Sequence, residues 1–211
     1  MLQSELNSIK ARLIDTLKRE LPGERAHRLM LPQGRQLNPA TDNNSIIQSS
    51  VLMLLFPYNR KISTCLIQRP SSMRTHAGQI AFPGGRFELQ DENLIHTALR
   101  ESFEEIGTEG SQIEIIGALT PLYVQISNFM INPFLGWCDD LPSFKIDQHE
   151  VDRLYVIPVE KLLHHTSNQF REVTTTNGTF SVPGFYIDQH FIWGATAMII
   201  SEFIEIFKIV K

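Results

Sequence analysis

Apolar residues recur along this chain with two periods, one typical of helices and one typical of buried strands. The first stretch predicts an amphipathic helix, which Pro22-Gly23 is expected to end; its apolar face is formed by Leu2, Leu6, Ile9, Leu13, Ile14 and Leu17. Short apolar runs predict strands at 50–57, 62–68, 113–119, 132–138 and 152–157. The chain is therefore expected to form a mixed α/β structure.

One helix is predicted between the second and third of these strands. Asp91 and Asn93 can cap its start, and Gly107 suits the left-handed residue that ends a helix. At about 100° per residue, four apolar side chains share one arc of this helix, which is expected to pack on the core. They are Ile95, Leu99, Phe103 and Ile106.

The C-terminal part predicts three further elements. Residues 159–165 are expected to start a helix or turn, and residues 170–192 a hairpin that turns at Asn177-Gly178. Residues 193–210 are apolar on most sides and predict a closing helix. We expect one globular unit, in which residues 1–45 form an N-terminal helix and a wrapping segment around a domain of residues 46–211.

The predicted helix before Gly107 carries a cluster of acids. Glu101, Glu104 and Glu105 fall within an arc of about 100°, where their charges repel one another. Bound Mg²⁺ or Mn²⁺ would remove this repulsion, since both ions prefer carboxylate oxygens. Arg100 can pair with Glu104 and hold its carboxylate in place. A solvated acidic face is the alternative interpretation of the same residues.

This acidic segment resembles the Nudix box, with Gly85 at the start of the loop that precedes it. The matching residues are Arg100-Glu101-Ser102-Phe103-Glu104-Glu105-Ile106-Gly107. The resemblance implies a Nudix-type α/β/α sandwich with a mixed sheet, and hydrolysis of a nucleoside diphosphate linked to another group. It also implies that Glu101, Glu104 and Glu105 bind the cations. The segment departs from the family pattern at Asp91, Ser102 and Thr108, and its spacer before Arg100 is one residue longer than usual.

A second pattern lies directly upstream and resembles the signature of the coenzyme A pyrophosphatase branch, RxxxxRxxxGxxxFPGG. The residues that carry it are Arg69, Arg74, Gly78, Phe82, Pro83, Gly84 and Gly85, and a looser match follows at Trp193-Gly194-Ala195-Thr196-Ala197. The longer spacer after Asp91 is also typical of this branch. The resemblance implies substrate binding by Arg69, Arg74, Gly78, Gly84 and Gly85. Ordinary surface ion pairs are the alternative role for the two arginines.

The implied reaction is divalent-cation-dependent cleavage of coenzyme A or a derivative into 3′,5′-ADP and 4′-phosphopantetheine or its acyl form. Glu104 and Arg100 are the expected catalytic residues of the box. Glu150 follows a loop that could reach the acids, so it is a candidate base or ligand, against the simpler reading of an exposed acid before a strand. Two alternatives remain: hydrolysis of ADP-ribose or another nucleoside diphosphate derivative, and a non-catalytic nucleotide-binding sensor.

Composition and net charge indicate which kinds of molecule this chain is expected to bind. The chain has 211 residues and a net charge of −4, which argues against a nucleic-acid-binding surface. Its two cysteines, Cys65 and Cys138, are expected to be buried, reduced thiols. We expect no leader peptide and no membrane span, hence a cytoplasmic enzyme that acts on a small molecule. The apolar N-terminal helix makes a homodimer a further expectation.

Overall fold

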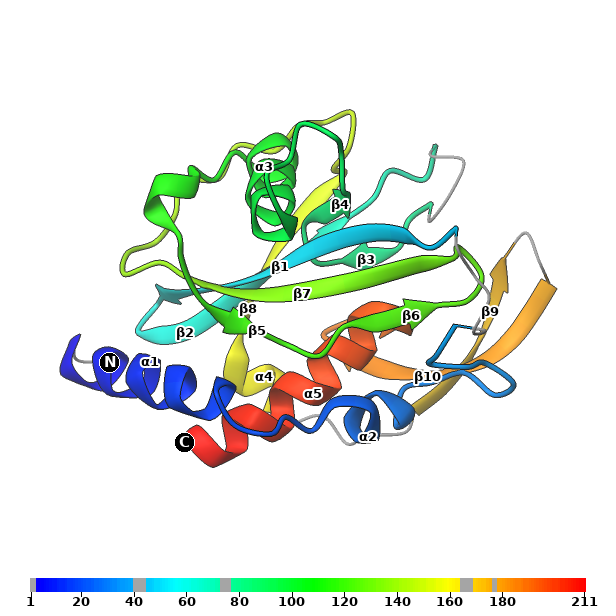
Figure 1. The fold of residues 1–211 in the computed structure, drawn as a ribbon, viewed down its shortest axis with the longest axis horizontal. Helices are drawn as coiled ribbons and strands as arrows, with labels where there is room; N and C mark the ends of the chain where they lie inside the picture. Colours follow the sequence, from blue (N-terminus) through cyan, green and yellow to red (C-terminus); the bar gives the residue numbers. More distant parts are fainter. Residues whose placement is uncertain (1–2, 40–44, 73–76, 164–168, 176–177) are drawn as a thin grey trace.

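The computed structural model describes residues 3–39, 45–72, 77–163, 169–175 and 178–211. Within them, eight strands form one mixed sheet (Figure 1). Its main path runs β3 (Ile80–Ala81), β2 (Lys61–Gln68), β1 (Ile47–Tyr58), β7 (Phe129–Trp137) and β5 (Glu114–Ala118). β4 (Gly84–Arg86) pairs with β1, β6 (Leu122–Val124) with β7, and β8 (Arg153–Pro158) with β2. The β1–β7 pair is parallel and the other pairs are antiparallel.

A separate antiparallel sheet follows in the order β11 (His190–Trp193), β10 (Gly178–Ile187) and β9 (Gln169–Thr175). The helices are α1 (Gln3–Leu17), α2 (Gly23–Arg28), α3 (Leu94–Ile106), α4 (Val159–Leu163) and α5 (Gly194–Val210), with a 3-10 turn at Gly110–Gln112. Figure 1 shows α3 on one face of the large sheet and α1, α2 and α5 on the other. The protein is therefore a layered α/β structure, as the sequence predicts.

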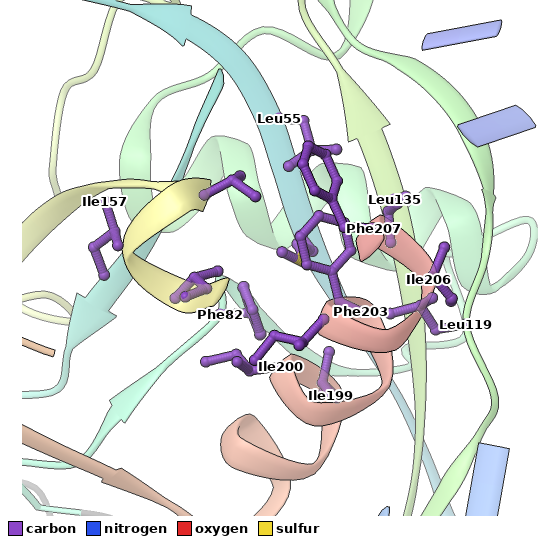
Figure 2. Packing of buried hydrophobic residues seen from close by; sticks show 14 of the residues in the cluster. Leu55, Phe82, Leu119, Leu135, Ile157, Ile199, Ile200, Phe203, Ile206 and Phe207 are labelled. Carbon is purple, nitrogen blue, oxygen red and sulfur yellow. The ribbon is translucent and has the colours of Figure 1, made fainter. Parts of the chain in front are cut away.

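Two hydrophobic clusters lie on the two faces of the large sheet. Leu52, Leu54 and Phe56 of β1 point toward α3, and Met53 and Leu55 of the same strand belong to the cluster that contains α5. This alternation follows from the period of two of a strand. Figure 2 shows Phe203 and Phe207 of α5 packed among Leu55, Leu135 and Ile200.

Most elements predicted from the sequence are confirmed. The five expected strands correspond to β1, β2, β5, β7 and β8, and the closing helix is α5. α3 begins after Asn93, whose side chain accepts a bond from the amide of His96, and ends at Gly107 in the left-handed conformation. The hairpin is also present, because Thr175 of β9 pairs with Gly178 of β10. Asn177, its expected turn residue, lies outside the described residues.

The predicted core face of α3 is partly wrong. Ile95 is 37% exposed and Phe103 50% exposed. The buried side consists instead of Thr97, Ala98, Ser102, Glu105 and Ile106. The small side chains among these let the helix approach β1 and β4 closely, so that the buried Glu105 accepts a bond from the amide of Gly84 in β4. Glu105 thus takes a buried position that amphipathicity alone assigns to apolar residues, whereas Ile106 and Leu99 of the predicted arc still pack on the α3-side cluster.

Two other expectations need correction at the N-terminus and near the C-terminus. Gly23 begins the short helix α2, so Pro22-Gly23 starts a second helix within the segment expected to wrap the domain. The segment predicted as a hairpin of residues 170–192 contains a third strand, β11, which starts at His190 and extends to Trp193, the residue expected to start the closing helix.

The apolar face of α1 is buried within the chain. Leu6 and Leu13 belong to the α5-side cluster, and Ile9, Ile14 and Leu17 pack against it. This contact accounts for the apolar pattern on which the expectation of a homodimer rests. Among the described residues, no helix is both long enough and apolar enough to cross a membrane. The thiols of Cys65 and Cys138 are free and buried, and burial raises their pKa values to about 12 and about 11.

Candidate metal centre

The bend at Pro83 and the first two residues of β4, Gly84 and Gly85, together called the glycine turn below, fit closely against the acidic side of α3. The amide of Gly84 donates a 2.9 Å hydrogen bond to Oε2 of Glu105. A Cβ on Gly85 would lie 2.4 Å from the carboxylate of Glu101, and one on Gly84 would lie 2.3 Å from the carbonyl oxygen of Ser50. Gly84 also has a φ of +152°, a conformation that residues with side chains rarely adopt. The two glycines therefore set how closely the acids of α3 approach the turn.

Three carboxylates converge beside this turn. Glu101 and Glu105 of α3 and Glu150 from the loop before β8 each offer one oxygen, and these oxygens all lie within 4.8 Å of one another. Such a set of hard oxygen donors fits a divalent cation such as Mg²⁺ or Mn²⁺. Like charges at this separation repel, which a bound cation would relieve. The structure thus contains an acidic cluster with the chemistry of a metal centre.

Glu104 lies outside this cluster. Its side chain is half-exposed, and Oε2 accepts a 2.8 Å bond from Nη1 of Arg100, the pairing that the sequence predicts. Nη1 of Arg100 also donates to Oε1 of Glu101, again at 2.8 Å. Arg100 thus connects one acid of the cluster with Glu104 at the solvent side of α3.

Burial controls the electrostatics of the cluster. It raises the pKa of Glu105 to about 8, although the nearby Arg69 and the Gly84 amide favour the ionised form. Burial also raises the pKa of Glu101, against the effect of its bonds to Arg100. A buried carboxylate with a raised pKa needs a compensating positive charge in order to ionise at neutral pH. This requirement agrees with a cation-binding role.

Arg69 contacts the cluster directly. Its Nη2 donates to Oε1 of Glu105 and to the carbonyl oxygen of Gly84, both at 3.2 Å. We call the segment between Arg69 and Gly78 the signature loop. The backbone of Arg69 pairs with the other end of this loop, since its amide donates to the carbonyl of Gln79 and its carbonyl accepts from the amide of Gly78. Gly78 therefore helps to close this loop through its main chain. Arg74 lies outside the described residues.

Asp91 has a different contact from the one expected. Asn93 alone provides the side-chain cap of α3, whereas the buried Asp91 carboxylate binds the guanidinium of Arg100 through Nε at 2.8 Å and Nη2 at 3.0 Å. Thr97 Oγ1 donates to the same carboxylate. The Arg100 guanidinium holds the pKa of Asp91 far below its usual range. Asp91 therefore fixes the arginine that in turn holds Glu101 and Glu104.

The sequence did not indicate two further contacts of residues in or near its motifs. Thr196, in the looser motif at the start of α5, donates to the carbonyl oxygen of Ile80 in β3 at 3.1 Å. Asp147 binds the end of α3 and the turn that carries Glu150. The bonds from Thr196 to Ile80 and from Asp147 to Glu105 have no local sequence signal, because each joins segments that are far apart in the chain.

The layered α/β fold and the three-carboxylate cluster beside its glycines have the features of a metal-binding enzyme site. The chain belongs to the Nudix family, since residues 47–178 match the NUDIX domain. It is thus a Nudix hydrolase, a pyrophosphohydrolase that uses divalent cations.

Relatives agree with this assignment. The protein named uncharacterized Nudix hydrolase NudL from Photorhabdus laumondii is 30% identical over 162 residues, which is 77% of this chain and 84% of the relative. The protein of the same name from Yersinia enterocolitica is 36% identical over 135 residues, 64% of this chain and 69% of that protein. The crystal structure of a MutT/nudix family protein from Enterococcus faecalis shares the fold, with a TM-score of 0.52 and 14% identity over 81% of this chain and 66% of that one.

Proposed function

We propose that this Nudix hydrolase cleaves the pyrophosphate bond of coenzyme A or its derivatives. The observation that carries the proposal is the upstream signature from Arg69 to Gly85, whose first arginine and final glycines contact the acidic cluster. In the reaction, the oxygen of water bonds to one phosphorus and the bridging P–O bond breaks. The products are 3′,5′-ADP and 4′-phosphopantetheine, or acyl-phosphopantetheine from an acyl substrate.

The acids of α3 and Glu150 have different proposed roles, in cation binding and in proton transfer. Glu101 and Glu105 would hold the cation. Glu104, which Arg100 keeps in place, would add a further carboxylate on the solvent side of α3. A bound Mg²⁺ or Mn²⁺ supplies charge neutralisation at the phosphates and lowers the pKa of water. Glu150 accepts a proton from the attacking water, since its carboxylate lies with those of Glu101 and Glu105.

The signature loop binds the substrate. A guanidinium offers planar, paired N–H donors that match phosphate oxygens, which suits Arg69 and Arg74 to this role. Arg69 contacts Glu105 and the Gly84 carbonyl, which supports a role for its guanidinium in binding a phosphate beside the carboxylate cluster. Substitution Arg74→Ala should chiefly raise KM, because a contact made equally in the ground and transition states affects binding more than kcat.

The test is a product analysis. The full-length protein is incubated with coenzyme A, acetyl-coenzyme A, oxidised coenzyme A, ADP-ribose and nucleoside triphosphates, with Mg²⁺, Mn²⁺ or a chelator, and the products are separated by liquid chromatography and mass spectrometry. Metal-dependent release of 3′,5′-ADP, absent in Glu105→Gln, would support the proposal. Faster turnover of ADP-ribose or a triphosphate would reject the coenzyme A assignment and keep the hydrolase. Absence of all hydrolysis would favour a nucleotide sensor.

A further inference from the structure

The loop before β8 is attached to the C-terminal end of α3. The last carbonyl groups of a helix have no partner within the helix. Here the amide of Lys145 donates to the carbonyl of Ile106 at 2.8 Å, and the amide of Asp147 donates to the carbonyl of Glu105 at 3.1 Å. Gly107 makes this approach possible, because a Cβ at that position would lie 2.7 Å from the carbonyl oxygen of Lys145. The residue whose side chain enters the acidic cluster therefore also binds this loop through its backbone.

Asp147 then organises the turn that follows. Its carbonyl accepts from the amides of Glu150 at 3.1 Å and Val151 at 2.8 Å. Its side-chain Oδ1 accepts from the amide of His149 at 2.8 Å. An aspartate that binds the amide two residues later stabilises a tight turn. With the bond to Glu105, four hydrogen bonds converge on this single residue.

The far side of the turn is fixed as well. Val151 is fully buried in the α3-side cluster, and the amide of Asp152 donates to the carbonyl of Gln68 at 2.8 Å. Glu150 thus lies between two anchored points, one on the metal-ligand helix and one on the end of β2. Its position relative to Glu101 and Glu105 depends on the shape of the four residues from Asp147 to Glu150.

We propose that Asp147 is a positioning residue for the reaction, which acts by holding Glu150 against the other two carboxylates. This inference rests on the proposed function, because it assigns Glu150 the proton-accepting role. The side chain of Asp147 accepts from the amide of His149, whereas its bond to α3 comes from its backbone amide. Removal of the carboxylate therefore loosens the turn that carries Glu150 and leaves its attachment to α3 in place.

The test is a double-mutant cycle on the best pyrophosphate substrate of the wild type. Asp147→Ala should lower kcat about tenfold or more, with KM changed less than about twofold, since the loss affects catalysis rather than binding. Asp147→Asn retains an oxygen acceptor and should recover most of kcat. Glu150→Gln should lower kcat by about 10²-fold or more. In that background, Asp147→Ala should cause less than about a twofold further loss.

Each contrary outcome has a separate meaning. Wild-type kcat in Asp147→Ala, or an equal loss of kcat in both backgrounds, would overturn the inference, as would wild-type kcat in Glu150→Gln. Thermal unfolding of each variant checks that the fold survives, and a failed rescue by Asp147→Asn in a folded protein would also contradict the mechanism. If the wild type hydrolyses no pyrophosphate substrate, the proposed function itself fails, which is distinguishable from an active Asp147→Ala enzyme.

Discussion

The amide of Gly84 and the carboxylate of Glu105 are joined by a 2.9 Å hydrogen bond that connects the glycine turn to α3. The other oxygen of the carboxylate accepts from Arg69, so both oxygens of a buried acid are held by fixed donors. An acid oriented in this way keeps one geometry toward a cation, whereas an exposed acid samples many. The buried acid of α3, rather than the exposed one, is therefore the residue on which we expect metal binding to depend most.

Glu105→Gln and Glu104→Gln form a matched pair on adjacent positions of the same helix. Glu105→Gln should lower kcat by about 10²-fold or more, because it removes a charged ligand worth several kcal/mol in the transition state. Glu104→Gln should have a smaller effect, since Glu104 lies outside the three-carboxylate cluster. Steady-state kinetics at saturating Mn²⁺ measure both. Equal losses in the two variants would contradict this ranking of the acids.

Gly85→Ala should inactivate the enzyme without unfolding it. The added methyl group would lie 2.4 Å from the Glu101 carboxylate, which must then move away from the cluster. We expect kcat to fall by about tenfold or more, while the melting temperature changes by only a few degrees. Gly110→Ala is the control, because its Cβ would make only an ordinary 3.9 Å contact with Leu99. An active Gly85→Ala enzyme would show that Glu101 does not need this position.

The raised pKa of Glu105 predicts a pH dependence of stability. Burial raises its pKa from the ordinary 4.5 of a glutamate to about 8 in the folded protein, so the folded state retains a proton that the unfolded state releases. This contribution to stability is complete below about pH 4.5 and is lost as the pH rises through about 8. In chelator, wild type should therefore be less stable than Glu105→Gln at about pH 9 and similar to it at about pH 4.

Addition of Mn²⁺ should reverse the order of stability of wild type and Glu105→Gln at about pH 9. A cation that binds only the folded state stabilises it, so Mn²⁺ should raise the melting temperature of the wild type at about pH 9 and have little effect on Glu105→Gln. Thermal unfolding of both proteins with and without Mn²⁺ measures the four values. A wild type whose stability relative to Glu105→Gln is independent of pH would contradict the burial-shifted pKa.

Local signals explain which features could be predicted from the sequence. Asn93 and Gly107 mark the ends of α3 correctly, because each acts on a backbone group within a few residues. Strands that contain a continuous run of apolar residues can be predicted equally well from the sequence. The buried face of α3 is harder to predict, because amphipathicity assumes that apolar residues are buried and acids exposed. In this helix, Glu105 is buried and Phe103 is half-exposed, which reverses that assumption at the acidic cluster.

Contacts between segments far apart in the chain have no local sequence signal. The residues of the Nudix-like box were visible as a motif, and so was the pairing of Arg100 with Glu104 across one helical turn. The bond between Asp147 and Glu105 joins two segments about forty residues apart, and its partners are backbone atoms that any residue type provides. A sequence pattern cannot identify such a bond, because pairing of this type depends on the fold that brings the segments together.

A buried polar network on the opposite side of the sheet should determine stability without affecting catalysis. Glu202 of α5 is fully buried and accepts from the amides of Gly23 and Thr120, from Thr120 Oγ1 at 2.6 Å, and lies 3.0 Å from Nε2 of His27. Glu202→Ala would leave these groups without an acceptor, at a cost of about 3–5 kcal/mol in the free energy of unfolding.

Glu205→Ala is the control on the same helix, because Glu205 pairs with the exposed Arg25 and its loss should cost at most about 1 kcal/mol. Urea denaturation measures both values, and the turnover of folded Glu202→Ala should equal that of the wild type. A small loss of stability in Glu202→Ala would show that water replaces the carboxylate at this position.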